Sequence, residues 1–399
     1  MIIAGLDIGS KSVRLVVGEL AEEGITLIDL IQVPSEGVKK GVVVNLETIT
    51  QCIRNAVLQV VEKHDIQIQE VILGLSGVQI IGQNSKGVVA IESRQKGVTA
   101  SDIERVLEAA SAVPMTLDHE IIHRIPNEYT IDGKQHASNP INMLGVRLEL
   151  NVHIIAVSST GAQGLVMAAN RAGLVVSHLM YCGYASSKVV LTADEYSLGA
   201  IHIVIGHDTT TVLCVKDGGV CSSFVIPIGG KHITNDLAIV LQTSVEEAER
   251  IKLQHGVCCA GVIDSNEEVL IQGIGIHRPR LSTQLDITRI IEARMREILC
   301  VILNFVQRSG LKIEEFHTVV LGGGGSLHIG ITELVQQELN IAARVGIPKR
   351  MSGLDANTRT PFWSTALGLL IDAREALSVQ VKKQKKSHGV VSWIRNFFE

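Results

Sequence analysis

Residues 2–20 read IIAGLDIGSKSVRLVVGEL, and this stretch predicts a β-hairpin. An apolar strand ends near a single carboxylate, Asp7, a tight Gly9-Ser10 turn follows, and residues 13–17 return as a second strand. Exposed backbone N–H groups in such a turn can bind phosphate oxygens, and an aspartate can hold Mg²⁺ through water. Taken alone, the stretch is equally compatible with an ordinary hairpin that has a polar tip.

Residues 197–215, SLGAIHIVIGHDTTTVLCV, repeat this pattern in the second half of the chain. A strand again leads into a polar tip and a second strand returns, with Gly206 in the place of Gly9. The likeness indicates an internal duplication of one hairpin unit. Two such hairpins that face each other could hold a charged ligand between their tips.

A glycine-rich loop, Gly322-Gly-Gly-Gly-Ser326, connects a predicted strand at residues 319–321 to a helix. Four glycines allow a ligand to approach the backbone closely at the helix N-terminus. A merely flexible loop is the alternative. Glu249 and Lys252 are three residues apart on one face of a helix predicted near residues 244–255, where a solvated ion pair is the simplest explanation.

Strands alternate with helices along most of the chain, which predicts the α/β class. A helix is expected over about residues 47–63, with Asn45 as its N-cap. Residues from about 78 to 157 look like a compact insertion with strands of its own, in which Thr99 and Asp102 predict a capping box. Because only 3% of the residues are aromatic, the core has to be aliphatic.

The composition excludes several classes of protein. With 46% hydrophobic and 19% charged residues among 399, intrinsic disorder is excluded for most of the chain. No run of 18 or more apolar residues is present, so no helix is expected to span a bilayer. Seven scattered cysteines without a CxxC spacing predict reduced, buried thiols in a cytosolic protein, and the N-terminus resembles a strand and not a signal peptide.

Charge is distributed unevenly along the chain. Residues 374–399 hold six Lys or Arg and two acids and so carry +4, while the whole chain carries −5; residues 1–373 therefore carry −9. An acidic body disfavours binding to nucleic acid, because that affinity comes mainly from neutralising phosphates. A basic tail on an acidic body favours an anionic surface as the partner.

The last residues, 389–399, read GVVSWIRNFFE and follow a basic stretch at residues 382–386. Their large apolar side chains recur at the spacing of one helical face: Val390, Trp393, Ile394, Phe397 and Phe398. Such a helix can lie in a membrane interface, and the neighbouring lysines favour anionic lipid. Docking of this helix on the body of the protein, or on a partner protein, is the alternative.

The two hairpins and the glycine-rich loop together resemble the actin-like ATPase superfamily. Within it the chain is similar along its whole length to the FtsA family of bacterial cell-division proteins. The resemblance rests on the opening hairpin, the insertion, the terminal helix and the stretches KKGVVVNLETI, VILGLSG, IIHRIPNEYTID, GVRLELNVHIIAV, IPIGGKHITNDLA, EEAERIKLQHG, VVLGGGGSLHIGI and PFWSTALGLL.

The resemblance implies an α/β, actin-like two-domain fold with duplicated ribonuclease-H-like units and the 1C insertion typical of FtsA. Subdomain 1A would comprise residues 1–77 and 158–198, and subdomain 1C residues 78–157. Subdomain 2A would comprise residues 199–239 and 316–376, and subdomain 2B residues 240–315. A basic linker at 377–388 would precede the membrane-targeting helix at 389–399.

The resemblance also assigns a site for ATP and Mg²⁺. The first phosphate loop would comprise Asp7, Gly9, Ser10 and Lys11, with Asp7 on the metal side. The second phosphate loop would comprise Gly206, Thr209 and Thr210. The nucleoside pocket would be lined by Gly229, Gly230, Glu249, Lys252, Gly322, Gly323, Gly324, Gly325 and Ser326.

The implied partners are those of a division adaptor. Subdomain 2B would receive the C-terminal peptide of the tubulin-like FtsZ at Arg280, Arg294 and Glu297, because guanidinium groups bind carboxylates bidentately. A solvated helix face is the plain alternative for these residues. The other implied partners are copies of the same chain in filaments, membrane lipids and later division proteins, at the cytoplasmic side of the membrane at the division site.

The second phosphate loop departs from the family pattern, which is roughly Ile-Asp-Ile-Gly-Gly-Gly-Thr-Thr-Asp. Val204 stands where the metal-side aspartate is expected, His207 and Asp208 replace two glycines, and Thr211 replaces the later aspartate. Valine cannot coordinate Mg²⁺, and Asp208 would repel phosphate unless it meets the metal itself. The departure predicts weakened ATP binding and little or no hydrolysis.

The sequence thus predicts an adaptor that tethers FtsZ filaments to the membrane and self-associates, with no catalytic residues and weak or absent ATPase activity. One tail helix per subunit would attach firmly once many subunits assemble. The alternatives are a small-molecule kinase or phosphatase of the same superfamily and a pilus-assembly adaptor of the same fold. Neither alternative calls for a lipid-binding terminal helix.

Overall fold

The computed structural model describes residues 1–372 except 22–23, 94, 116–117, 264–265 and 276–277. Contacts divide the chain into two units. The first comprises Met1–Ser76, Thr160–Val190 and the part from Ile347 onward, and the second comprises Gly77–Ser159 and Leu191–Gly346. Each unit is built around its own five-stranded sheet.

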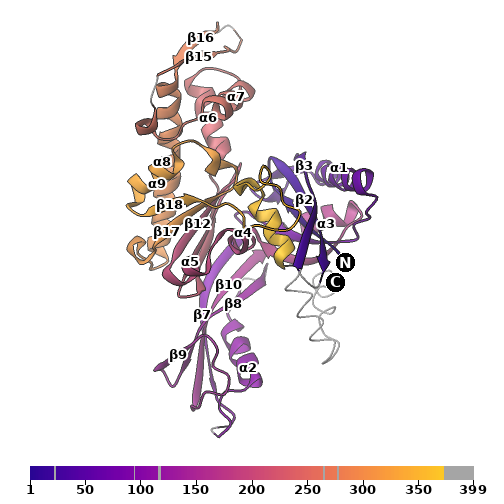
Figure 1. The fold of residues 1–399 in the computed structure, drawn as a ribbon, viewed down its shortest axis with the longest axis vertical. Helices are drawn as coiled ribbons and strands as arrows, with labels where there is room; N and C mark the ends of the chain where they lie inside the picture. Colours follow the sequence, from indigo (N-terminus) through magenta and orange to yellow (C-terminus); the bar gives the residue numbers. More distant parts are fainter. Residues whose placement is uncertain (22–23, 94, 116–117, 264–265, 276–277, 373–399) are drawn as a thin grey trace. The chain divides into compact units, whose positions relative to one another are not determined.

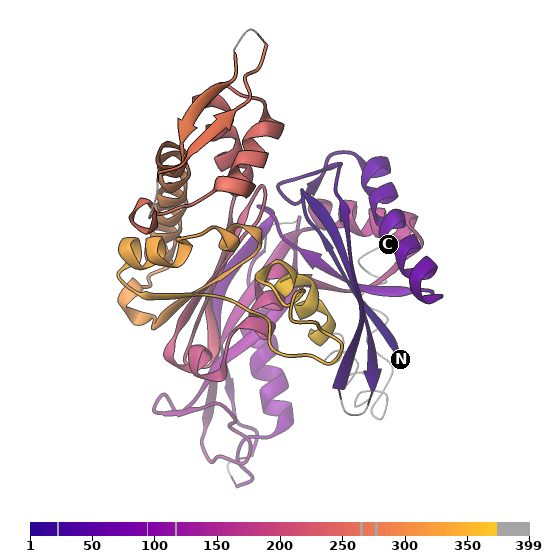
Figure 2. The ribbon, with the colours of Figure 1, turned by 45° about the horizontal axis from the view of Figure 1, so that its top comes forward.

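The sheet of the first unit has the order β11-β6-β1-β2-β3. β1 pairs antiparallel with β2 and parallel with β6, and the long strands β1, β2 and β3 are drawn in indigo in Figure 2. The bounds are β1 (Ile2–Ile8), β2 (Ser12–Ala21), β3 (Gly24–Pro34), β6 (Glu70–Leu75) and β11 (Val175–Tyr181), with a small pair formed by β4 (Val38–Lys39) and β5 (Val42–Val43).

Helices α1 (Leu46–His64), α3 (Ser159–Arg171) and α4 (Cys182–Val190) accompany this sheet. Asn45 caps α1 by accepting a hydrogen bond from the Thr48 amide, which confirms the predicted helix start. The 3₁₀ turn η4 (Pro361–Trp363) leads into a helix over residues 364–372. This helix packs closely on the sheet because Gly5 and Gly74 leave room for Leu369.

The sheet of the second unit repeats the first, with the order β14-β13-β12-β17-β18 and the same sequence of antiparallel and parallel neighbours. The bounds are β12 (Ala200–Ile205), β13 (Thr210–Lys216), β14 (Gly219–Ile226), β17 (Thr318–Gly322) and β18 (Ala342–Val345). The hairpin tips also match: the Gly9 amide donates to the Ser12 carbonyl at 3.0 Å and the Gly206 amide to the Thr209 carbonyl at 2.9 Å. The predicted duplication is therefore confirmed.

The insertion forms a second sheet within this unit, with the order β7-β10-β8-β9, covered on one face by α2. The bounds are β7 (Ile80–Ala90), β8 (His119–Ile131), β9 (Gln135–Ala137), β10 (Arg147–Ser158) and α2 (Ala100–Ser111). Thr99 and Asp102 form the predicted capping box at the start of α2.

Polar side chains of the insertion bind the backbone of β14. The Asn127 amide group both donates to the Val220 carbonyl, at 2.7 Å, and accepts from the Val220 N–H, at 3.0 Å. Asn84 donates to the Cys221 carbonyl at 2.8 Å. His153 is 1% exposed, and its Nε2 lies 2.7 Å from the Ser223 hydroxyl. The insertion thus satisfies polar groups along the outer strand of the sheet.

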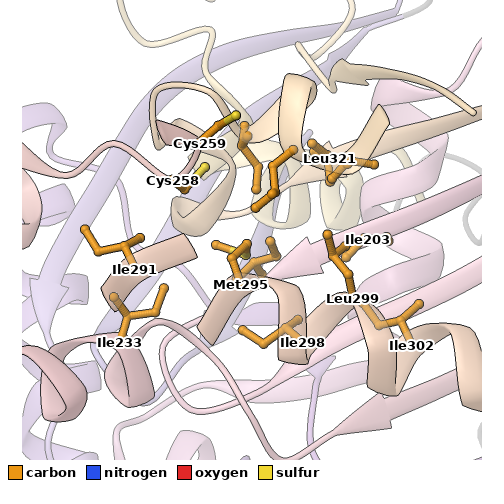
Figure 3. Packing of buried hydrophobic residues seen from close by; sticks show 14 of the residues in the cluster. Ile203, Ile233, Cys258, Cys259, Ile291, Met295, Ile298, Leu299, Ile302 and Leu321 are labelled. Atoms are coloured by element: carbon orange, nitrogen blue, oxygen red, sulfur yellow. The ribbon is translucent and has the colours of Figure 1, made fainter. Parts of the chain in front are cut away.

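The core of the second unit is aliphatic, as predicted, and α8 contributes much of it (Figure 3). Met295 and Leu299 of α8 lie among Ile203 and Leu321 of the sheet and Ile233 of α6. The remaining bounds are α5 (Ala193–Leu198), α6 (Gly230–Val240), α7 (Val245–His255), α8 (Gln284–Arg308), α9 (Ile331–Leu339), β15 (Glu268–Ile271), β16 (Arg280–Thr283), η1 (Ala260–Val262), η2 (Ile313–Glu315) and η3 (Gly324–Leu327). Figure 1 labels most of these elements.

The described cysteines are free thiols, and their burial differs in part from the prediction. Cys182, Cys214, Cys258 and Cys259 are buried, but Cys300 is exposed on α8 and Cys52 and Cys221 are half-buried. Cys300 is exposed because it lies on the solvent-facing side of α8. The buried side of this helix is formed mainly by Ile, Leu and Met residues.

Candidate nucleotide-binding site

The tip of the second hairpin rests on the start of α6. The amides of Gly230 and Lys231 donate to the carbonyls of Gly206 and His207, at 2.9 and 2.8 Å. A Cβ atom on Gly229 would lie 2.7 Å from both of those carbonyl oxygens. Glycine at this position is therefore required by the close approach of two backbones.

A buried cation joins α6 to α7. The Lys252 side chain is 6% exposed, and its Nζ donates to the Thr234 hydroxyl at 2.8 Å, to Glu249 at 2.6 Å and to the Gly230 carbonyl at 3.2 Å. The Thr234 hydroxyl also donates to Glu249. The Glu249–Lys252 pair is therefore not a solvated surface contact. Lys252 of α7 is buried, and its ammonium group donates to groups in the first turns of α6.

The glycine-rich loop packs on the end of β12. Gly323 has a φ of +75°, and a Cβ there would lie 2.5 Å from the Ile205 carbonyl. Gly325 is in contact with the Ile205 side chain, and the Ser326 hydroxyl donates to the Gly323 carbonyl at 2.8 Å. Gly324 is exposed. Packing thus explains Gly323 and Gly325, while the exposed backbone at Gly324 is open to a ligand.

Two histidines flank this loop and stay uncharged at neutral pH. His202 is fully buried beneath Gly322 and donates from Nδ1 to the Val320 carbonyl at 2.9 Å; burial lowers its pKa to about 4. Burial also lowers the pKa of His328, and the charge of Lys252 acts in the same direction. The loop therefore adds little positive charge to the site.

The first hairpin holds its carboxylate in an ion pair. Asp7 is 3% exposed, and its Oδ2 lies 3.2 Å from Nη2 of Arg14 on the paired strand. Arg14 also donates to the Phe362 carbonyl, and its guanidinium lies 4.5 Å from the centre of the Phe362 ring. Burial and the Asp7 charge raise the pKa of the neighbouring Cys182 thiol. Lys11 is exposed at the tip, next to half-buried Gly9 and Ser10.

The second unit brings together most of the predicted nucleotide residues. The Gly206 tip contacts Gly229 and Gly230, Gly230 contacts Lys252, and the glycine-rich loop contacts Ile205 beside the tip. The predicted residues of the first hairpin belong to the other unit. Sequence reasoning missed Arg14, Lys231, Thr234 and His328; only Arg14 carried a signal, because hairpin pairing places it opposite Asp7.

The residues of the second unit fit a nucleoside better than they fit the phosphates and Mg²⁺. Glycine backbone and the Glu249–Lys252 pair provide polar groups on the side predicted for the nucleoside. On the second hairpin, Val204 offers no oxygen ligand and the Thr210 hydroxyl donates to the Ile228 carbonyl at 2.8 Å. Among the described residues, no cluster of three or more His, Cys, Asp or Glu is arranged to hold a metal ion. The phosphate side of this hairpin therefore does not fit Mg²⁺ and phosphate.

The residues predicted to bind a partner peptide are partly engaged. Arg294 donates bidentately to Asp236 of α6, at 2.5 and 2.8 Å, and pairs with Glu297. Arg280 is exposed at the start of β16 and donates to the Val240 carbonyl at 3.1 Å. Arg280 is thus the more accessible cation of the two, while Arg294 joins α8 to α6.

The predicted membrane residues Val390, Trp393, Ile394, Phe397 and Phe398 lie outside the described residues. Within the described part of the chain, no helix combines the length and the apolar character needed to cross a bilayer.

The duplicated sheets define an actin-like fold, and comparison with solved structures agrees. A structure of the PilM-PilN type IV pilus biogenesis complex matches with a TM-score of 0.66 and 18% identity, over 93% of this chain and 98% of that chain. MreB5 of Spiroplasma citri bound to ADP matches with a TM-score of 0.55 and 12% identity, over 97% and 99%. At these identities the likeness concerns the fold alone.

Sequence comparison defines the family. The sequence-family model described as cell division protein FtsA matches residues 201–368. The family model described as the SHS2 domain inserted in FtsA matches residues 77–156. Cell division protein FtsA of Borreliella burgdorferi is 34% identical over 100% of this chain and 98% of its own length. The FtsA protein of Escherichia coli is 33% identical over 99% of this chain and 96% of its own length. The chain belongs to the FtsA family of cell-division proteins.

Proposed function

We propose that this protein tethers FtsZ filaments to the cytoplasmic side of the cell membrane at the division site. The observation that carries the proposal is the full-length similarity to FtsA proteins, which includes the inserted domain. The amphipathic pattern at residues 389–399, preceded by the basic residues at 382–386, supports the membrane part of the role.

The filament-binding surface is assigned to the part of the second unit around β16. Arg280 is exposed there and can pair with carboxylates of an acidic peptide. Large apolar side chains near it are also exposed: Ile239 by 73%, Val240 by 56% and Leu281 by 61%. An exposed apolar patch beside an accessible guanidinium group is typical of a peptide-binding site. Arg294 and Glu297 of α8 belong to the proposed surface as well, although Arg294 already pairs with Asp236 of α6.

Self-association turns a weak anchor into a firm one. A single short interfacial helix gives reversible membrane binding, whereas an array of linked subunits binds with high avidity. The same array presents many FtsZ-binding surfaces on one side of the membrane. Adenine nucleotide binding on the side of Lys252 and the glycine-rich loop is part of the proposal, and no catalytic step is required for tethering.

Co-sedimentation with liposomes that contain anionic lipid tests this function. We expect the wild-type chain to pellet and to bring FtsZ down with it. A Trp393→Glu/Phe397→Glu variant should stay in solution, and an Arg280→Glu variant should pellet without FtsZ. If the wild type and the tail variant both stay in solution, the tail is a docking helix and the membrane role is wrong.

A further inference from the structure

The two hairpin tips carry opposite charges at equivalent positions. The last paired residues are Ile8 with Val13 in one hairpin and Ile205 with Thr210 in the other. Counting from these pairs, Lys11 of the first tip corresponds to Asp208 of the second. The same register places Val204 opposite Thr211 where the first hairpin has Asp7 opposite Arg14. The second hairpin has thus lost a carboxylate from its strand and gained one at its tip.

The Asp208 carboxylate is buried at the tip. Its side chain is 7% exposed, and Nζ of Lys231, in the first turn of α6, lies 3.9 Å from its Oδ1. Lys231 is 42% exposed, so the cation reaches solvent while the carboxylate does not. The tip therefore contains its own anion together with a counter-charge.

Several backbone hydrogen-bond donors around this tip are used by the protein. The Gly206 amide donates to the Thr209 carbonyl, and the amides of Gly230 and Lys231 donate to carbonyls of the tip. The Gly229 amide donates to Nδ1 of His232 at 3.1 Å. A phosphate bound by these amides would have to displace these bonds as well as meet a buried negative charge.

We propose that Asp208 is a built-in anion that occupies the electrostatic place of a terminal phosphate, so that this chain binds adenine nucleotide without preference for the triphosphate and without help from Mg²⁺. The inference rests on the nucleotide-binding part of the proposed function. It makes Asp208, with Lys231 as its counter-charge, the residue that sets phosphate specificity, and it makes tethering insensitive to whether ATP or ADP is bound.

Isothermal titration of the full chain with ATP and with ADP, each with and without Mg²⁺, tests the inference. We expect the wild type to bind the two nucleotides with similar affinity and no response to Mg²⁺. Asp208→Asn keeps the size of the side chain and removes its charge, and it should raise the affinity for ATP relative to ADP by about tenfold, because one charge at several ångströms is worth about 1.4 kcal/mol or more.

Asp217→Asn is the matched control. Asp217 is an exposed residue in the turn between β13 and β14, and its φ of +53° is tolerated by asparagine. The control makes the same change in net charge and should leave both affinities unchanged. Thermal unfolding of both variants checks that the hairpin remains folded.

Three results would overturn the inference. If Asp208→Asn lowers ATP affinity and removes a Mg²⁺ dependence present in the wild type, then Asp208 is a metal ligand. If the variant leaves the ratio of ATP to ADP affinity unchanged, the buried charge does not set specificity. If the wild type binds neither nucleotide, the inference fails together with the nucleotide-binding part of the proposed function, on which it rests.

The liposome assay separates this inference from the proposed function. Asp208→Asn should pellet with liposomes and FtsZ as the wild type does, with or without nucleotide. If the wild type fails to pellet, tethering is wrong, while the titration still reports on the hairpin. A Val204→Asp/Asp208→Asn variant, which restores the strand carboxylate, should gain a Mg²⁺-dependent rise in ATP affinity that Asp208→Asn alone does not show.

Discussion

Arg14 and Asp7 lie directly opposite each other on β2 and β1, and their side chains form an ion pair of 3.2 Å that is nearly closed to solvent. The exposed fractions are 16% for Arg14 and 5% for Asp7. Removing one partner of such a pair leaves a buried charge without compensation, which costs far more than the pair itself contributes. The stability of the first unit therefore depends on keeping both charges, Asp7 and Arg14, in the first hairpin.

We expect Arg14→Met to lower the free energy of unfolding of the first unit by about 3 kcal/mol. Trp363 packs edge-on against Phe362, the ring that Arg14 covers, so its fluorescence reports on this region. A Trp393→Phe background makes Trp363 the single tryptophan, because the chain has two. Asp7→Asn/Arg14→Met should lose less than the sum of the single variants; strict additivity would mean that the two charges do not interact.

Lys252→Met should destabilise the second unit by about 2–3 kcal/mol, because it leaves Glu249 and Thr234 without their buried donor. Arg250→Met is the control on the same helix. Arg250 pairs bidentately with Glu247 at 2.7 Å but is 41% exposed, so its loss should cost less than about 1 kcal/mol. Urea unfolding followed by circular dichroism measures both. Equal losses would show that burial of Lys252 contributes nothing.

Two buried histidines make the second unit sensitive to acid. Burial lowers the pKa of His153 and of His202 to about 4, against an ordinary value of 6.5. The unfolded chain therefore binds more protons than the folded one between these values, so stability is lost as the pH falls from 6.5 toward 4. Each histidine should cost about 2 kcal/mol between pH 7 and pH 5.

Equilibrium unfolding of wild type and His153→Gln at both pH values measures this loss. The variant should lose about 2 kcal/mol less stability on acidification than the wild type does, because it lacks the contribution of His153. The effect belongs to histidine and not to the paired carboxylates of this unit, because Asp102 and Glu195 have lowered pKa values and titrate only in stronger acid. A wild type with equal stability at pH 7 and pH 5 would contradict the prediction.

Asn127→Ala should loosen the contact between the inserted domain and β14. It removes the acceptor of the Val220 amide and the donor to the Val220 carbonyl, and it should lower stability by about 1–3 kcal/mol. Hydrogen exchange of the Val220 amide should become faster. Asn170→Ala, at an exposed position of α3, should leave that exchange unchanged. Unchanged protection of Val220 in Asn127→Ala would mean that another group shields this strand.

Local patterns in the sequence predicted much of this fold. Hairpin periodicity gave both β1–β2 and β12–β13, and the side chains of Asn45 and Thr99 marked the helix starts that the structure confirms. These features depend on neighbours within a few residues. The pairing of Asp236 with Arg294, 58 residues apart, depends on how α6 meets α8, so no local pattern could indicate that Arg294 is already engaged.

The glycine-rich loop illustrates a second limit. Its composition suggested a ligand, and no structural reason for the glycines was evident from the sequence. In the structure glycine is required at positions 323 and 325 because the loop packs closely on Ile205. Ile205 is the last residue of β12, which is far away in the sequence. Packing and ligand binding favour the same residue at such positions, so the sequence alone cannot separate the two causes.

The hydrogen bonds between the inserted domain and β14 have a mechanical consequence. Asn127 and Asn84 hold the first half of β14, and the strand ends at Ile226, immediately before the start of α6 at Gly230. The Ile228 carbonyl in between is held by Thr210 of the hairpin. A displacement of the inserted domain along β14 would therefore reach the segment between β14 and α6, whose Gly230 amide donates to the Gly206 carbonyl of the hairpin tip.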